Sequence, residues 1–284
     1  MLSRMTASTA KPGRRLAWQL LLPVLLVLSG LAVAANTRVR VLAAPPAAVT
    51  ALGALAPDVD WLPADAADAE LTLIWQADAY GRGTAQFPAQ PVLLLAQGMT
   101  GLSLRAQDAV LTWGPSLAQQ IQLARQINPG LLRIGILYRS AQHAEIEALQ
   151  RSAGADILAR AVEPPLQARD ISELAQRSDM LIASNDDQLF NRDSAKLVLL
   201  TAYRHQRAWI GPTPAFVTAG ALASRAVGKE ALLRAIVEKV RTWQQHRLGA
   251  SQQLQADSVV CNQQVARSLG LNLAPALGCQ GGRE

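Results

Sequence analysis

Residues 128–140 have the sequence NPGLLRIGILYRS and contain the strongest strand signal of the chain. The run from Leu132 to Tyr138 is apolar apart from Arg133 and Gly135, which predicts a short buried strand. Ser140 then precedes an amphipathic stretch that extends to about Ser152, so we expect a helix with Ser140 as its N-cap. A buried strand that leads directly into a helix is typical of a βαβ unit.

The same alternation of strand and helix continues on both sides of this stretch. Further strands are predicted at residues 38–42, 70–75, 91–96, 155–161, 179–183, 208–211 and 257–261, and further helices at 47–55, 116–127, 169–177, 194–205, 229–247 and 263–269. Strands separated by helices of this length indicate parallel pairing with right-handed crossovers. The fold class expected from the pattern is therefore α/β, with room for two lobes of ordinary size.

The first 35 residues have the features of an export signal. Lys11, Arg14 and Arg15 precede a mostly apolar run from Leu16 to Ala35, which contains the small residues Ala32-Val33-Ala34 near its end. This order is typical of a secretory signal peptide. An uncleaved membrane anchor is the alternative, since about 20 apolar residues can span a bilayer. Both alternatives place the rest of the chain outside the cytoplasm, and we expect a periplasmic location.

The net charge of the chain is less informative than its value of +6 suggests. Four of the 27 basic residues lie in residues 1–34, which contain no acidic residue, so the remainder has 23 basic and 21 acidic residues and a net charge of +2. A nucleic-acid-binding protein needs a concentrated basic face. Arginine is scattered here without a run of three, which argues against a nucleic-acid partner.

The two cysteines, Cys261 and Cys279, leave two alternatives open. Export permits a disulfide between them, and closing that loop stabilises a fold by roughly 3 kcal/mol on the chain-entropy model. Two free thiols in a poorly ordered tail are the other alternative.

Four stretches resemble a known family when they are taken together and in order. They are NPGLLRIGILYRS (128–140), SDMLIASNDDQLF (178–190), FVTAGALAS (216–224) and VVCNQQVARSLGLNL (259–273). The chain resembles the periplasmic substrate-binding proteins of an uncharacterised ABC-transport family that includes tryptophan-binding-type receptors. The resemblance covers about half of the chain.

This resemblance implies a type I periplasmic-binding fold, in which two Rossmann-like lobes close on a small molecule. We expect residues 36–127 and about 224–250 in the first lobe, and residues 128–223 and about 251–284 in the second. The sequence departs from the family in its first lobe, which is short and lacks the glycine-threonine ligand turn after Trp75. It also lacks the aromatic-rich stretch that usually follows Ser224.

Candidate ligand-binding residues follow the predicted strands, because ligands of open parallel sheets lie beyond the carboxyl ends of the strands. Asp186 matches the family's aspartate and is a candidate to pair with a ligand ammonium group, although a turn or helix cap is the alternative. Near it, Ser184 and Asp187 are weaker candidates. Tyr138 can stack on a ligand or fill a lobe interface.

Three further residues complete the set of candidates. The helix start at Ser140 can hold an anion or can simply be capped by the serine. From the first lobe, Trp75 and Thr100 are candidates for the facing wall, with ordinary packing as the alternative for the tryptophan.

The sequence offers little for catalysis or metal binding. His143, His205 and His246 lie far apart without the spacing of metal ligands, and no nucleophile elbow or phosphate-binding loop is present. Asp186 and Asp187 are adjacent, which is a poor arrangement for an acid–base pair. We therefore expect a protein that is not an enzyme and uses no cofactor or metal.

Three functions remain as hypotheses. The first is a monomeric binding protein that captures a small metabolite, such as an amino acid, for an ABC permease. The second is a module of the same fold that serves a membrane sensor or an outer-membrane uptake system, which the short first lobe favours. The third, a cleft hydrolase, has the least support from the sequence.

Overall fold

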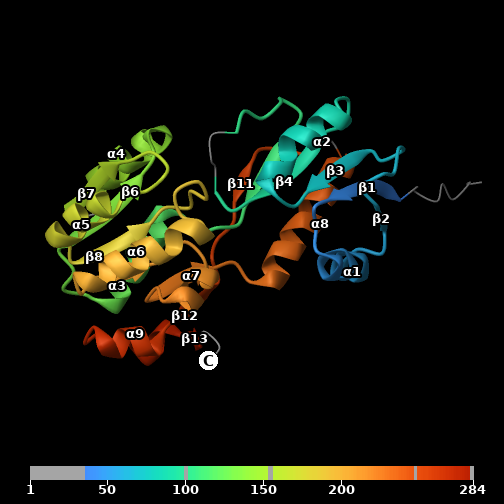
Figure 1. Ribbon diagram of the computed structural model, residues 1–284. Coiled ribbons are helices and arrows are strands. Elements are labelled where there is room, and N and C mark those ends of the chain that lie inside the picture. The colour runs from blue at the N-terminus through green and yellow to red at the C-terminus, as the bar shows by residue number, and fades with distance from the viewer. Residues whose placement is uncertain (1–35, 99–101, 153–155, 246–247, 282–284) are drawn as a thin grey trace, which may run out of the picture. The chain divides into compact units, whose positions relative to one another are not determined.

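The computed structural model describes residues 36–98, 102–152, 156–245 and 248–281 (Figure 1). The predicted signal peptide lies outside the described residues, and residues 36–284 form one compact unit. The strands are β1 Thr37–Leu42, β2 Val59–Leu62, β3 Leu71–Ile74, β4 Val92–Ala96, β5 Ala109–Thr112, β6 Arg133–Tyr138, β7 Asp156–Ala161, β8 Met180–Ala183, β9 Ala208–Ile210, β10 Ala223–Ala226, β11 Gln252–Gln253, β12 Ser258–Cys261 and β13 Gln280–Gly281. The helices are α1 Pro46–Leu55, α2 Tyr80–Gln86, α3 Leu117–Ile127, α4 His143–Ser152, α5 Ala168–Arg177, α6 Arg192–Arg204, α7 Pro214–Ala219, α8 Lys229–Gln245 and α9 Gln263–Ser268.

The first sheet has six parallel strands in the order β11-β5-β4-β3-β1-β2. Its central strands β3, β4 and β5 are buried along their whole length, as expected inside a parallel sheet, whereas the edge strands β2 and β11 are partly or fully exposed. On one face, apolar residues of α8 such as Ile236 and Val240 pack with Val39, Leu73 and Leu93. On the other face, residues near the start of α2, including Tyr80, pack on β3, β4 and β5.

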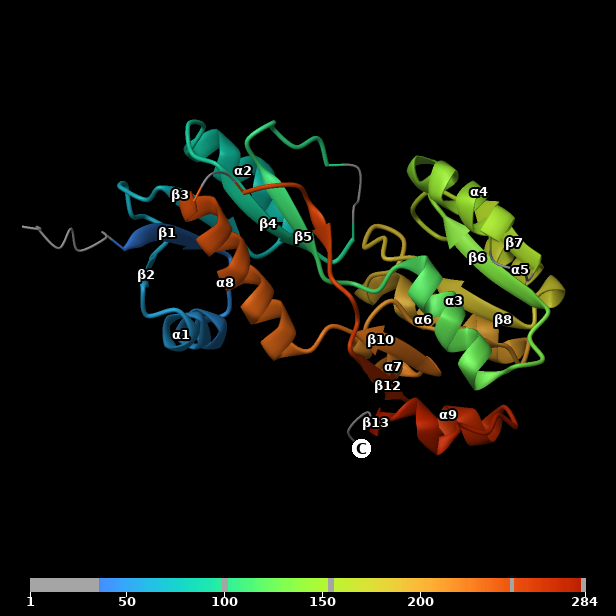
Figure 2. The same cartoon turned by 180° about the vertical axis from the view of Figure 1, so that it is seen from behind.

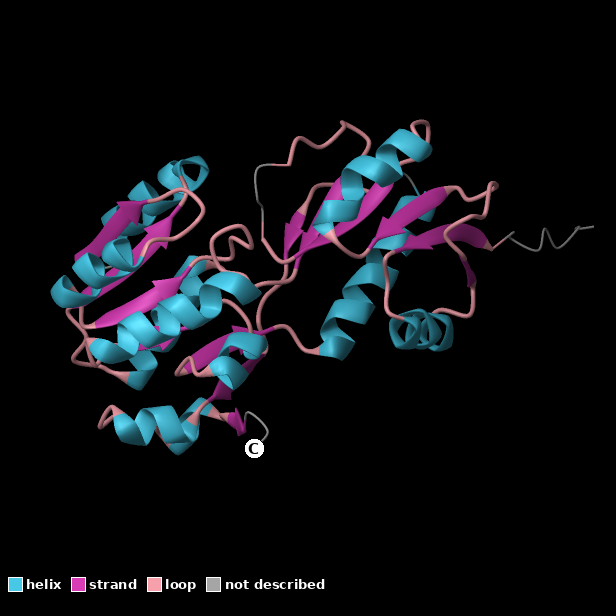
Figure 3. Cartoon of the chain, in the orientation of Figure 1, coloured by secondary structure: helices cyan, strands magenta, loops and turns pink. Residues whose placement is uncertain are grey.

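The second sheet has seven strands in the order β13-β12-β10-β9-β8-β6-β7, all parallel to their neighbours except the antiparallel pair β10 and β12. Helices α3 and α9 cover one face, and helices α5, α6 and α7 cover the other. Figure 1 shows α6 and α7 in front of this sheet, and Figure 2 shows α3 in front of it from behind. Figure 3 shows the same layers by element type.

Local sequence explains why several elements begin where they do. Ser116 caps α3 in a capping box, because its hydroxyl accepts from Gln119 N and the Gln119 side chain accepts from Ser116 N. Asn191 caps α6 by accepting from Asp193 N and Ser194 N. The prediction that Ser140 caps a helix is wrong. Ser140 instead begins a 3₁₀ turn ahead of α4, and its hydroxyl donates to Glu163 Oε1 at 3.1 Å.

In the described chain, three segments connect the two sheets. They are residues 113–116 between β5 and α3, residues 227–228 between β10 and α8, and residues 254–257 between β11 and β12. Two of these segments are bonded to one another, since Asp257 Oδ1 accepts from Gly228 N at 2.7 Å, and Gln119 Nε2 at the start of α3 donates to Gln255 Oε1 of the third segment at 2.8 Å. Both lobes are therefore discontinuous in sequence.

The sheets divide the chain at slightly different places from the predicted lobe boundaries. Residues of α3 contribute to the core of the second sheet, although residues up to 127 were expected in the first lobe. Strand β10 lies in the second sheet and β11 in the first. The second part of the first lobe, expected at about residues 224–250, is therefore shifted by a few residues at both ends. Of the described helices, none is both long and apolar enough to cross a membrane.

Candidate functional site

A cavity of about 180 Å³ lies where the carboxyl ends of strands from both sheets come together. Its lining comes from segments far apart in the sequence, namely Gly98, Thr112, Pro115, Ser116, Leu117, Gln142, Glu145, Asn185 and Gln253. Strands β4, β5, β6 and β8 all end beside this cavity or within a few residues of its lining. Because ligands of open parallel sheets bind at this edge, the cavity is the candidate site.

Asn185, directly after β8, brings the two sets of strand ends into contact. Its side-chain nitrogen donates to Pro115 O, in the first segment that connects the sheets. A Cβ atom added to Gly98 would lie 2.0 Å from Asn185 O, and one added to Gly114 would lie 2.8 Å from Asn185 Cγ. Only glycine permits this approach at Gly98, which explains the residue type there.

Glu145 gives the lining its only ionisable side chain. It lies in the first turn of α4. The side chain remains accessible to solvent, yet the protein around it raises the pKa of its carboxyl above the ordinary value, and burial is the single cause of that rise. Among the described residues, no hydrogen bond or ion pair uses the Glu145 carboxylate. The cavity therefore contains a partly desolvated carboxylate without a cation beside it.

Two of the amide side chains of the lining, those of Gln253 and Asn185, are held by hydrogen bonds that their nitrogen atoms donate. Gln253 Nε2 donates to Gly114 O at 2.7 Å and also to Thr112 O and Leu254 O. Asn185 is held through its nitrogen as well, while its Oδ1 is buried without a partner in the described part of the chain. Gln142 is the exception, since its Oε1 accepts from Arg139 N. Among the described residues, the side-chain oxygens of Asn185 and Gln253 are left as acceptors, whereas Gln142 leaves its side-chain nitrogen as a donor.

Several solved structures have the same arrangement of elements. The chain is similar to an ABC domain in complex with L-Trp from Streptococcus pneumoniae, at 16% identity with a TM-score of 0.60, over 86% of this chain and 99% of that one. It is similar to a ligand-free, open substrate-binding protein with adhesive properties from Clostridium difficile, at 14% identity with a TM-score of 0.61, over 86% and 97% of the two chains. It is also similar to a conserved domain protein from Vibrio cholerae, at 15% identity with a TM-score of 0.57, over 87% of this chain and 99% of that one.

The chain has the type I periplasmic-binding fold. This confirms the fold expected from the resemblance in sequence. No protein-family model and no curated protein sequence matches the chain. At these identities, likeness to solved structures shows the fold alone and does not identify a binding site.

Within this fold, Asp186 is engaged by the protein itself. Its side chain is 1% exposed, and Arg139 Nε donates to its Oδ2 at 2.5 Å. Its Oδ1 accepts from Gln188 N at 3.0 Å, which is the turn-type contact considered as the alternative. The predicted pairing of Asp186 with a ligand ammonium group would therefore compete with Arg139.

The neighbours of Asp186 have different environments. Ser184 is fully buried, and its hydroxyl has no partner among the described residues. Asp187 is exposed, and its pKa is raised first by partial burial and then by the charge of Asp186. Neither residue lines the cavity, although Asn185 between them does. The predicted binding roles of Ser184 and Asp187 stay predictions.

Tyr138 and Ser140, at the end of β6, make contacts inside the second lobe. Tyr138 is 7% exposed, and its hydroxyl lies 3.1 Å from His143 Nδ1, with the two rings stacked. Ser140 is bonded to Glu163, as described above. Packing and local hydrogen bonding therefore account for both side chains in this structure.

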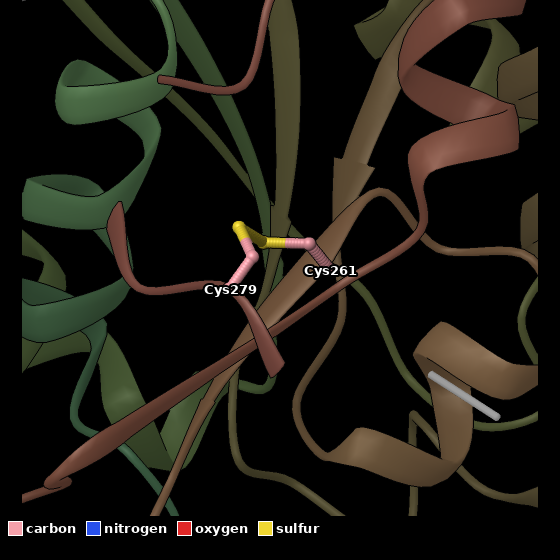
Figure 4. Close-up of a disulfide and its surroundings, with 2 residues drawn as sticks. All are labelled: Cys261 and Cys279. Atoms are coloured by element: carbon pink, nitrogen blue, oxygen red, sulfur yellow. A yellow bond between two sulfur atoms is a disulfide. The ribbon is translucent and has the colours of Figure 1, made fainter. Parts of the chain in front are cut away.

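Of the remaining candidates, Trp75 and the two cysteines do not line the cavity. Trp75 is partly buried and packs against the core shared by α1 and α8, which is the ordinary packing considered for it. Thr100 lies outside the described residues. Cys261 and Cys279 form a disulfide (Figure 4), so the alternative of two free thiols is not the one observed.

Sequence reasoning missed Glu145, Gln142 and Gln253 as lining residues. Glu145 is one of several charged residues in a polar helix, and nothing in its neighbours distinguishes it from Glu147. Gln253 lies in a two-residue strand that has no periodic signal. These three residues come together only because the chain crosses between the two sheets several times. No short sequence motif predicts those crossings.

Four larger hollows, of about 290 to 630 Å³, lie elsewhere in the described chain, and their linings do not include Gly98, Thr112 or Asn185. One, of about 480 Å³, lies between β7 and α5, and the largest of the four, of about 630 Å³, lies beside the end of α8. Within the described part of the chain, no group of three or more histidine, cysteine or acidic side chains is placed to hold a metal ion.

Proposed function

We propose that this chain is an extracytoplasmic solute-binding protein that captures a small metabolite between its lobes and delivers it to an ABC permease. The cavity at the strand ends carries the proposal, since it combines residues of both lobes with polar groups that the protein leaves unpaired. The signal-like N-terminus and the disulfide support delivery to an oxidising compartment. On this proposal the protein acts by binding rather than by catalysis.

The volume of the cavity restricts the solute. Typical small-molecule sites measure about 300–1,000 Å³, whereas this cavity measures about 180 Å³. A solute with few non-hydrogen atoms fits this space. The same small volume favours the second candidate, a module of this fold that binds a membrane sensor or uptake partner without a solute.

Thermal unfolding of the purified protein against a panel of amino acids, amines, sugars and organic acids tests the proposal. A solute at a hundred times its Kd stabilises the fold by about 2.7 kcal/mol. For a domain of this size we expect a rise in Tm of several degrees. No rise with any solute, together with specific capture of a membrane partner, would favour the second candidate.

A further inference from the structure

The lining of the cavity is unbalanced in charge and in hydrogen-bonding capacity. Glu145 is its only ionisable residue, so the cavity contains a carboxylate and no cationic side chain. The pKa of Glu145 is raised by burial alone, which means that no neighbouring positive charge offsets the loss of solvent. An ionised carboxylate in this position gains from a cation that enters the cavity.

Two of the uncharged lining residues, Asn185 and Gln253, show the same bias, whereas Gln142 leaves its side-chain nitrogen as a donor. The side-chain nitrogens of Asn185 and Gln253 are committed to backbone carbonyl groups, which fixes the orientation of both amides. Their oxygens are left as acceptors, and Asn185 Oδ1 is buried without a partner among the described residues. A buried acceptor without a donor costs free energy that a donor from a solute would recover.

The start of α3 offsets this bias only in part. A helix start attracts anions because its first N–H groups are unpaired. Here Ser116 N donates to Gln119 Oε1 and Gln119 N donates to Ser116 Oγ, so the capping box uses two of the first four N–H groups and leaves those of Leu117 and Ala118. A carboxylate of a solute would meet Glu145 and would have no cationic side chain in the lining as a partner.

We propose that the cavity selects a small organic cation, whose ammonium group is held by Glu145 and by acceptor oxygens of the lining. An ammonium group has three donors and no acceptor, which matches the unused groups around the cavity. The inference rests on the proposed solute-binding function and specifies its substrate class. It differs from the expectation of an amino acid, whose carboxylate would find no charged partner in the lining.

A matched four-carbon series tests this charge selection. Putrescine, γ-aminobutyrate, butanediol and succinate differ mainly in the charges at their ends, and each is added to the purified protein before thermal unfolding and calorimetry. We expect the largest rise in Tm with putrescine and none with succinate. Butanediol or succinate stabilising the protein as much as putrescine would overturn the inference.

The variant Glu145→Gln keeps the shape of the side chain and removes its charge. We expect it to weaken binding of putrescine, or of the organic cation that binds best, by at least tenfold. Glu147→Gln is the matched control, because Glu147 lies on the same helix, is exposed and does not line the cavity. The circular dichroism spectrum and Tm without solute verify that both variants fold. Unchanged binding of the cation by Glu145→Gln would contradict the inference.

The two proposals fail in different ways. If a neutral or anionic solute raises Tm and no organic cation does, solute binding stands and charge selection by Glu145 is wrong. If no solute of any class raises Tm, the proposed function fails, and the inference fails with it.

Discussion

Asp108 is the best-supported buried carboxylate of the first lobe. Its side chain is 0% exposed, and it accepts from Arg105 Nε at 2.7 Å, from Tyr80 Oη at 2.5 Å and from Val92 N at 2.9 Å. Burial by itself would raise its pKa, but these hydrogen bonds and the charge of Arg105 together lower it. The group joins the segment before β5 to β4 and to the start of α2.

We predict that Asp108→Asn destabilises the protein by about 2–3 kcal/mol at neutral pH, because it removes charge-assisted hydrogen bonds to a buried group. The lowered folded-state pKa means that this contribution is present above the unfolded value near 3.9 and is lost as pH falls through the folded value. Urea unfolding from pH 7 to pH 3 should therefore show the difference from the unaltered protein shrinking below about pH 4. The exposed Asp78→Asn is the control, and an equal loss in both variants would refute the assignment.

The ion pair of Arg139 and Asp186 leads to a second prediction at this scale. Removing one partner of a buried pair costs about 3–5 kcal/mol, since the other charge is left uncompensated. We expect Asp186→Ala to lower Tm strongly, while Asp187→Ala, at the adjacent exposed position, changes it little. If Asp186 also binds a solute ammonium group, Asp186→Asn will abolish the rise in Tm with solute as well. A fully retained rise would limit Asp186 to a structural role.

The sequence could not predict which side chains of the site pair with one another, as Arg139 and Asp186 do. The ends of β4, β6 and β8 were located correctly, because apolar runs such as Leu132–Tyr138 end at polar residues, whereas the end of β5 was not predicted. Which of those polar residues face the cavity depends on pairs such as Arg139 with Asp186, which are 47 positions apart. Asp186, the preferred candidate, is neutralised by such a pair, whereas Glu145 is not.

At the scale of elements, prediction succeeded where the hydrophobic pattern was long. Strands β1, β3, β4 and β6 and helix α3 lie within two residues of the predicted ranges. Strands β2 and β5 were missed, because no α-helix lies between β2 and β3 or between β4 and β5, so the alternation of strand and helix does not mark them. The 3₁₀ turn at Ser140 was missed because Glu163, far away in sequence, takes the serine hydroxyl.

The close contact between the loops after β4 and β8 can be tested by substituting Gly98. We predict that Gly98→Ala destabilises the protein by about 1–3 kcal/mol through overpacking, because its Cβ would lie 2.0 Å from Asn185 O. It should also weaken solute binding by separating the strand ends. Gly53→Ala, inside α1 with no atom within 4 Å of the added Cβ, should instead stabilise the protein by roughly 0.5–1 kcal/mol. Chemical denaturation of both variants measures the contrast, and similar effects at the two sites would exclude close packing at Gly98.

At the scale of the whole molecule, the C-terminal segment is joined to the second lobe by the disulfide and by β13. Cys261 is 2% exposed at the end of β12, and Cys279 lies directly before β13, which pairs with β12. The two cysteines are 18 positions apart. A loop of this length corresponds to a stabilisation of about 3 kcal/mol on the chain-entropy model.

We predict that the double variant Cys261→Ala, Cys279→Ala lowers Tm by several degrees and leaves solute binding intact, because the disulfide lies away from the cavity. A reducing agent should lower the Tm of the unaltered protein toward that of the variant and should not affect the variant. Thermal unfolding with and without reductant measures this, and a reductant-insensitive Tm in the unaltered protein would show that the bridge contributes nothing.

The return of α8 and β11 to the first lobe has a consequence for the order of events during synthesis. The core that contains Val39 and Leu73 is completed by Ile236, Val240 and Leu254, so an early part of the chain waits for a late one. Strands β6 to β10 come from one continuous stretch, but their sheet also receives β12 and β13 from the end of the chain. We therefore expect neither lobe to have its complete core until nearly the whole polypeptide is available.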